Sequence, residues 1–262
     1  MSALTYETSD HVATITLNRP ERMNTISPAM LDELCDMLKR ANKDAEARVV
    51  VLTGTGRAFC AGLDLTEASR GEGIGGGQRQ APETLDLSHT PPTVLFDMDK
   101  PVICALNGSA AGYGMDLALG CDIRIMAAES KMSAAFTARG VLPESGGTWL
   151  LPRMIGWAKA AELIFTGRTL NAEQCLQMGL VSQVVPADQC LVTARALAAE
   201  IAANAPLAVQ GAKRMMRMGA DETFDNHVHH VYLQLLPLFK SEDFREGMKA
   251  FMEKRKASFT GR

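Results

Sequence analysis

The feature of this chain that most limits its fold is a series of short apolar runs, each followed by a turn and a helical pattern. Arg48–Thr53 (RVVVLT) and Pro101–Asn107 (PVICALN) are the clearest of these runs. Because they lack the alternation of a half-exposed strand, they predict strands that are buried on both faces. Strands that alternate with helices in this way predict an α/β fold.

Neighbouring segments fit the same pattern. His11–Leu17 and Asp122–Ala128 predict further strands. Ser27 and Pro28 predict the start of a helix that runs to about residue 42, because serine suits an N-cap and proline suits the first helical turn. Leu170–Val185 predicts a helix, a stop at a glycine and a strand.

The C-terminal part of the chain differs, because predicted strands end near Ala187. Only helical patterns follow, at Leu191–Ala203, Leu207–Met218, Asp221–Phe239 and Glu242–Lys256. We therefore expect a core at residues 1–203 that carries the functional site, and a helical region at residues 204–262 that mediates oligomerisation. Residues 66–93 are rich in glycine and show no period, which predicts an irregular segment beside the site.

Bulk composition excludes several classes of protein. The net charge of -3 gives no broad basic field, so we expect no nucleic-acid partner. No apolar stretch reaches the roughly 18 residues of a membrane span, and residues 1–10 do not resemble a signal peptide. The six cysteines are scattered, which predicts buried, reduced thiols in a cytoplasmic protein. His227, His229 and His230 lack further ligands at suitable spacing, so we expect no metal site.

Two glycine-containing segments follow predicted strands. They are Arg57–Leu65 (RAFCAGLDL) and Asn107–Asp116 (NGSAAGYGMD). In the second, a helix begins near Gly112, and its first amides have no partner within the helix. In the first, Gly62 allows a tight turn that presents the Leu63 amide. Two such amides aimed at one oxygen would form an oxyanion hole, although simple strand-to-helix turns have the same spacing.

Six segments together resemble one known family over nearly the whole chain. In chain order they are LNRPERMNTIS, GRAFCAGLDL, KPVICALNGSAAGYGMDLALGCDIRIMA, LPESGGTWLLPR, FTGRTLNAEQCLQMGLVSQVV and DFREGMKAFMEKRKASFTG. They resemble the enoyl-CoA hydratase/isomerase (crotonase) superfamily. The resemblance implies a crotonase-like spiral of ββα turns with a C-terminal α-helical trimerisation region, and hence a homotrimer or a dimer of trimers.

The resemblance also implies a substrate and a set of contacts. The substrate is an acyl-CoA thioester, and no cofactor is needed besides the coenzyme A of the substrate. The thioester oxygen is expected between the amides of Leu63 and Tyr113. Tyr113 replaces a usual glycine, but its amide can donate if its φ angle is negative. The other expected substrate-binding residues are Arg22, Ala61, Asp64, Leu65 and Phe136. For Arg22, a solvated surface role is an open alternative.

Two carboxylates determine which proton chemistry is expected. Family hydratases use two glutamates, which match Asp116 and Phe136 here, so the first acid is shortened and the second is lost. Glu144 instead matches an acidic residue of family isomerases, including the ring-opening-type isomerases of phenylacetate degradation that this chain also resembles. Desolvation would raise the pKa of such a carboxylate toward the working range of a base. We therefore expect double-bond isomerisation through Glu144, with hydration as the next candidate.

Several alternatives remain open at this point. Glu144 is also placed to cap the helix that starts near Gly147, and Asp116 is suited to either a catalytic or a structural role. The same scaffold supports dehalogenation, thioester hydrolysis, carbon–carbon cleavage or non-catalytic acyl-CoA binding. Tyr113, Phe136 and Trp149 are compatible with a bulky or aromatic acyl pocket and also with an ordinary core.

Overall fold

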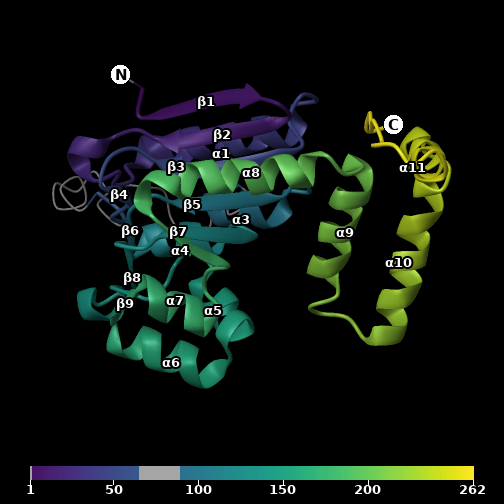
Figure 1. Ribbon diagram of the computed structural model, residues 1–262. Helices are drawn as coiled ribbons and strands as arrows, with labels where there is room; N and C mark the ends of the chain where they lie inside the picture. The colour runs from purple at the N-terminus through teal and green to yellow at the C-terminus, as the bar shows by residue number, and fades with distance from the viewer. Residues whose placement is uncertain (1, 65–88) are drawn as a thin grey trace.

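A six-stranded sheet lies at the centre of the computed structural model, which describes residues 2–64 and 89–262 (Figure 1). Its strand order is β1-β2-β3-β5-β7-β10, with β1 and β2 antiparallel and the other neighbours parallel. The bounds are β1 Leu4–Ser9, β2 Val12–Leu17, β3 Val49–Gly54, β5 Val102–Leu106, β7 Ile123–Ala127 and β10 Gln183–Val185. The sequence predicted all of these strands except β1.

A second sheet is built from very short strands in the order β4-β6-β8-β9. The bounds are β4 Ala58–Cys60, β6 Ser109–Ala111, β8 Lys131–Ser133 and β9 Thr169–Asn171. Strands β4, β6 and β8 each follow a strand of the large sheet, so the chain repeats a ββα turn, and the predicted crotonase-like α/β fold is confirmed. Segments of three residues are too short to show a period, and the sequence therefore did not predict this sheet.

The helices that the sequence predicted begin and end close to the predicted positions, whereas those at Pro91–Asp97 and Trp157–Thr166 were not predicted. Their bounds are α1 Pro28–Lys43, α3 Pro91–Asp97, α4 Tyr113–Leu119, α5 Gly147–Ile155, α6 Trp157–Thr166, α7 Ala172–Met178, α8 Cys190–Ala202, α9 Pro206–Met218, α10 Phe224–Leu238 and α11 Glu242–Met252. Ser27 caps α1 by accepting the Met30 amide, as predicted. The prediction of an irregular segment at residues 66–93 is wrong at its C-terminal end, because residues 91–93 belong to α3. Residues 66–88 of the predicted segment lie outside the described residues.

Both faces of the central strands β3 and β5 are buried, which explains the continuous apolar runs. Val49 and Val51 of β3 face helix α8, whose alanines allow it to pack closely on the sheet. Val50 and Leu52 point to the opposite side, into a larger core that includes α1, α3 and α4. All six cysteines are buried and unpaired, as predicted.

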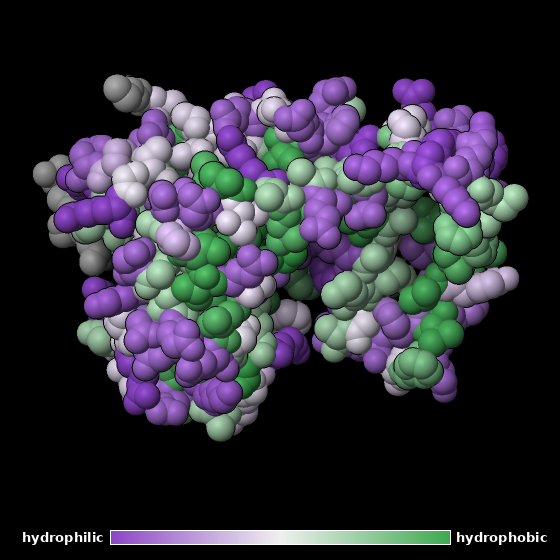
Figure 2. All heavy atoms as spheres, viewed as in Figure 1, coloured by the Kyte–Doolittle hydropathy of each residue, from purple (hydrophilic) through white to green (hydrophobic). Residues whose placement is uncertain are grey.

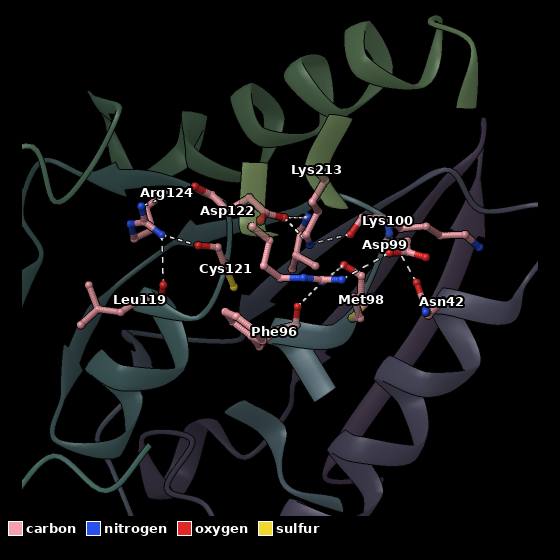
Figure 3. Close-up of polar contacts among 12 residues, drawn as sticks. Asn42, Phe96, Met98, Asp99, Lys100, Leu119, Cys121, Asp122, Arg124 and Lys213 are labelled. Atoms are coloured by element: carbon pink, nitrogen blue, oxygen red, sulfur yellow. Dashed lines mark hydrogen bonds and ion pairs between the residues drawn. The ribbon is translucent and has the colours of Figure 1, made fainter. Parts of the chain in front are cut away.

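Helices α9, α10 and α11 stand beside the sheet at one end (Figure 1). Helix α9 is attached through its basic side chains: Lys213 Nζ lies 2.7 Å from Asp122 Oδ2 and donates to the Lys100 carbonyl oxygen at 3.0 Å (Figure 3). Figure 2 shows apolar side chains gathered on the C-terminal helices. Phe224, Phe251 and Met252 are each more than three-quarters exposed there. No helix in the described ranges is both long and apolar enough to cross a membrane.

Arg124 of β7 is a buried cation that fastens the end of α4 to the sheet (Figure 3). Its Nη1 donates to the carbonyl oxygens of Leu119 and Cys121, and its Nε donates to that of Leu180 at 2.6 Å. These carbonyls lie at a helix end, where they lack intrahelical partners. Arg124 thereby fixes the helix that carries Tyr113 and Asp116.

We predict that Arg124→Met lowers the free energy of unfolding by about 2–4 kcal/mol, because buried carbonyl oxygens lose a charged donor. Urea unfolding at a fixed protein concentration measures this change. Arg139→Met is the matched control, because Arg139 is exposed, and it should change the value by less than about 0.5 kcal/mol. Equal effects of the two substitutions would contradict the assigned role of Arg124.

Candidate active site

The two glycine-containing turns of the sequence meet at one edge of the small sheet. Strands β4 and β6 are parallel neighbours, with Cys60 opposite Ala110, so the turns that follow them lie side by side. Gly62 has a φ angle of 107°, and a Cβ there would lie 3.0 Å from the Ala111 oxygen and 3.8 Å from the Tyr113 nitrogen. A Cβ on Gly114 would overlap the Cys60 carbonyl. The close approach of the two backbones therefore depends on these glycines.

The Leu63 and Tyr113 amides both lie at this junction. Ile26 donates to the Gly62 oxygen at 2.9 Å and accepts from the Asp64 amide at 2.9 Å, so the intervening Leu63 amide points away from Ile26. Tyr113 is the first residue of α4, and its amide has no partner within the helix. Gly112 takes the positive φ angle of 51° at the N-cap, which leaves Tyr113 in helical conformation. Within the described residues, neither amide makes a hydrogen bond.

Asp116 lies one turn further along α4 and is almost completely buried, with 1% of its surface exposed. Its Oδ2 accepts the Ser145 amide at 3.1 Å, and its Oδ1 is buried without a hydrogen-bond partner among the residues described. Burial raises the pKa of Asp116 to about 7; the Ser145 amide opposes this shift, the charge of Glu144 adds to it, and the Gly147 amide opposes it. Asp116 thus joins α4 to the turn that precedes α5.

Glu144 lies in that turn and remains exposed to solvent. Desolvation by the surrounding protein raises the pKa of its carboxyl, and its own backbone amide partly opposes the shift. Glu144 does not cap α5: the N-cap is Gly146, and no side chain accepts a capping hydrogen bond there. The capping role that the sequence left open for Glu144 is therefore wrong. The carboxylate that binds this turn is that of Asp116.

Glu144 lines a cavity of about 540 Å³ between α3, α5 and the turn after α9. The lining residues are Thr90, Pro92, Thr93, Phe96, Gly120, Glu144, Ser145, Gly146, Trp149, Leu150 and Asp221. Phe96 and Trp149 meet edge to face, with ring centroids 5.6 Å apart. Arg153 stacks on Trp149 at 3.9 Å and lies 3.7 Å from the Asp221 carboxylate. Phe96 was not selected from the sequence, because a lone phenylalanine near an irregular segment carries no recognisable pattern.

The remaining expected site residues occupy different surroundings. Asp64 is buried and forms ion pairs with Arg19 at 3.3 Å and Arg22 at 3.1 Å, so its carboxylate holds the Leu63 turn to the segment around Arg22. The Ala61 amide donates to the Met23 carbonyl oxygen at 3.0 Å, which strengthens the same attachment.

Phe136 and Leu65 are the last of the expected substrate contacts. Phe136 is buried in the core and is absent from the cavity lining around Glu144. Leu65 lies outside the described residues.

Two of the histidines for which the sequence predicted no metal site lie near an acidic side chain. His227 and His230 each contact Glu222, at 3.4 and 2.9 Å.

Comparisons with known proteins agree with this architecture. The enoyl-CoA hydratase/isomerase family model matches residues 7–262. The chain is 39% identical to 1,2-epoxyphenylacetyl-CoA isomerase of Escherichia coli, over 96% of this chain and 95% of that one. It is 37% identical to (E)-benzylidenesuccinyl-CoA hydratase of Thauera aromatica, over 98% and 99%. A crystal structure of enoyl-CoA hydratase from Bacillus anthracis superposes with a TM-score of 0.90 at 35% identity, covering 100% of both chains. The chain therefore belongs to the enoyl-CoA hydratase/isomerase family and is an acyl-CoA enzyme with the crotonase fold.

Proposed function

We propose that this enzyme shifts the double bond of an enoyl-CoA thioester, with Glu144 as the group that carries the proton. The observation that supports this assignment most strongly is the position of Glu144, which lines a largely apolar cavity open to solvent and has a carboxyl whose pKa is raised by desolvation. The other carboxylate in that lining, that of Asp221, forms an ion pair with Arg153.

The Leu63 and Tyr113 amides would receive the thioester oxygen. In a 3-enoyl substrate, the Glu144 carboxylate removes a proton from C2, and the electrons of that C–H bond pass into a dienolate whose negative charge rests on the thioester oxygen. Two backbone amides stabilise this charge and need little reorganisation during the reaction. Glu144 then returns the proton to C4, and the double bond moves from C3–C4 to C2–C3. The step needs neither a water molecule nor a second acid.

Hydration is the second candidate, because curated relatives are named both as hydratases and as isomerases. It requires a water molecule that is held and activated beside C3. The residue that matches the second glutamate of family hydratases is the buried Phe136, which cannot accept or donate a proton. Isomerisation therefore remains the preferred reaction.

The acyl group is proposed to be bulky or aromatic. One relative is named for a substrate with a phenyl ring and another for a substrate with an epoxidised six-membered ring, and the cavity beside Glu144 has Phe96 and Trp149 in its wall. An aromatic ring that packs against such a wall gains edge-to-face contacts in addition to apolar burial.

We also propose that residues 204–262 form the contact of a homotrimer or a dimer of trimers. The exposed apolar side chains of α10 and α11, such as Phe224 and Phe251, would lose contact with water in such an assembly. Coenzyme A is expected only as part of the substrate.

Glu144→Gln should lower kcat for 3-enoyl-CoA isomerisation about a thousandfold, because the amide cannot accept a proton. The change in absorbance as the double bond becomes conjugated measures the rate. Binding of a saturated acyl-CoA should be nearly unchanged, and Glu129→Gln, at an exposed position, serves as the control. Full turnover by Glu144→Gln would exclude this residue as the proton carrier.

The rate should depend on pH through the raised pKa of Glu144. Only the ionised carboxylate removes a proton, so kcat/KM should be highest above this pKa and fall as the pH drops through it. A pH profile of kcat/KM is expected to place this acidic limb above the usual range of a glutamate. A limb at or below the ordinary value would argue against a desolvated base.

Trp149→Leu should lower kcat/KM for 5-phenyl-3-pentenoyl-CoA relative to 3-hexenoyl-CoA by about two- to tenfold, since one wall of the cavity loses its ring. The other tryptophan supplies the control: Trp157 is 76% exposed and does not line this cavity, so Trp157→Leu should leave the ratio unchanged. An unchanged ratio in Trp149→Leu would mean that this wall does not select the acyl group.

A further inference from the structure

Asp116 is a buried carboxylate of α4 that contacts the turn carrying Glu144. It is 1% exposed, and its Oδ1 has no hydrogen-bond partner among the residues described. Its Oδ2 is bound to the Ser145 amide, and its Oδ1 lies directly against Gly147. In this position the side chain reaches the backbone of the turn and extends no further.

The fit between Asp116 and the turn is tight. A Cβ on Gly147 would overlap Asp116 Oδ1 and would also lie 2.9 Å from Pro143 Cβ, so residue 147 must lack a side chain. Gly146 adopts a φ angle of 94°, which favours glycine. The two glycines of the segment PESGG are thus explained by the carboxylate of α4 and the conformation of the turn.

Ser145 is held to α4 through its backbone. Its amide donates to Asp116 Oδ2 at 3.1 Å. The Ser145 side chain opposes the rise that burial causes in the pKa of Tyr113, so it lies near the first residue of α4. Since Ser145 directly follows Glu144, the bond to Asp116 restricts where the Glu144 backbone lies relative to the first turn of α4.

From these contacts we infer that Asp116 is a positioning residue, which holds the Glu144 turn at a fixed place relative to the Tyr113 amide. The inference rests on the proposed function and assigns Asp116 no proton-transfer step. The Asp116 carboxylate fixes the distance between two groups that act on the substrate. These are the Tyr113 amide, which stabilises the oxyanion, and the Glu144 carboxylate, which moves the proton. A displacement of about 1 Å between such groups can slow a reaction about a hundredfold.

Two substitutions at the same position test this role. Asp116→Asn keeps an oxygen that accepts the Ser145 amide but cannot exchange a proton, and we expect kcat to fall only about three- to tenfold. Asp116→Ala removes the acceptor, and we expect kcat to fall about a hundredfold while KM for the acyl-CoA changes less than about twofold. Asp188→Ala, at an exposed aspartate remote from the cavity, is the control.

Glu144→Gln is measured in parallel, so that the two proposals can fail separately. Loss of turnover in Asp116→Asn as severe as in Glu144→Gln would overturn the inference, because Asp116 would then move a proton itself. Wild-type kcat in Asp116→Ala, or a loss that appears in KM and not in kcat, would also overturn it. If Asp116→Ala does not fold, the comparison of Asp116→Asn with Glu144→Gln decides. Full activity of Glu144→Gln would instead refute the proposed function.

Discussion

The close approach of two backbone turns is the constraint on which the rest of the site depends. The turn after β4 and the first residues of α4 lie so near each other that Gly62 and Gly114 leave no room for ordinary side chains. This contact is possible because β4 and β6 are parallel neighbours whose carboxyl ends share one edge. The Leu63 and Tyr113 amides reach the same place as a result, and neither amide is used by the secondary structure around it.

The carboxylates of Asp64, Asp116 and Glu144 differ in burial and in charged neighbours, and we assign them different roles for this reason. Asp64 is neutralised by two arginines and anchors the first turn. Asp116 is buried beside the amides of Ser145 and Gly147, where it joins α4 to the turn before α5. Glu144 alone combines access to the large cavity with a raised pKa and no ion pair in the described parts of the chain. The proposed reaction follows from this division, since a double-bond shift needs one mobile proton and a stabilised oxyanion.

Much of the fold could be predicted from the sequence, because long apolar runs and helix caps are local patterns. The strands around Val50 and Ile103 and the helix that begins after Ser27 belong to this group. The small sheet could not be predicted, because strands of three residues show no period and are held by pairing with distant segments. The sequence predicted that the two glycine-containing turns converge, and the pairing of β4 with β6 brings them side by side. The contact between Asp116 and Ser145 joins residues 29 positions apart, so no local pattern reveals it.

A crystal structure with a non-reactive acyl-CoA bound would test the central claim most directly, through the two distances from the thioester oxygen to the Leu63 and Tyr113 nitrogens. Our account predicts that both are about 2.7–3.1 Å, the range of oxyanion-hole hydrogen bonds. It also predicts that the Glu144 carboxylate lies within reach of C2 and C4. A thioester oxygen bound elsewhere, with either amide turned away from it, would contradict the account.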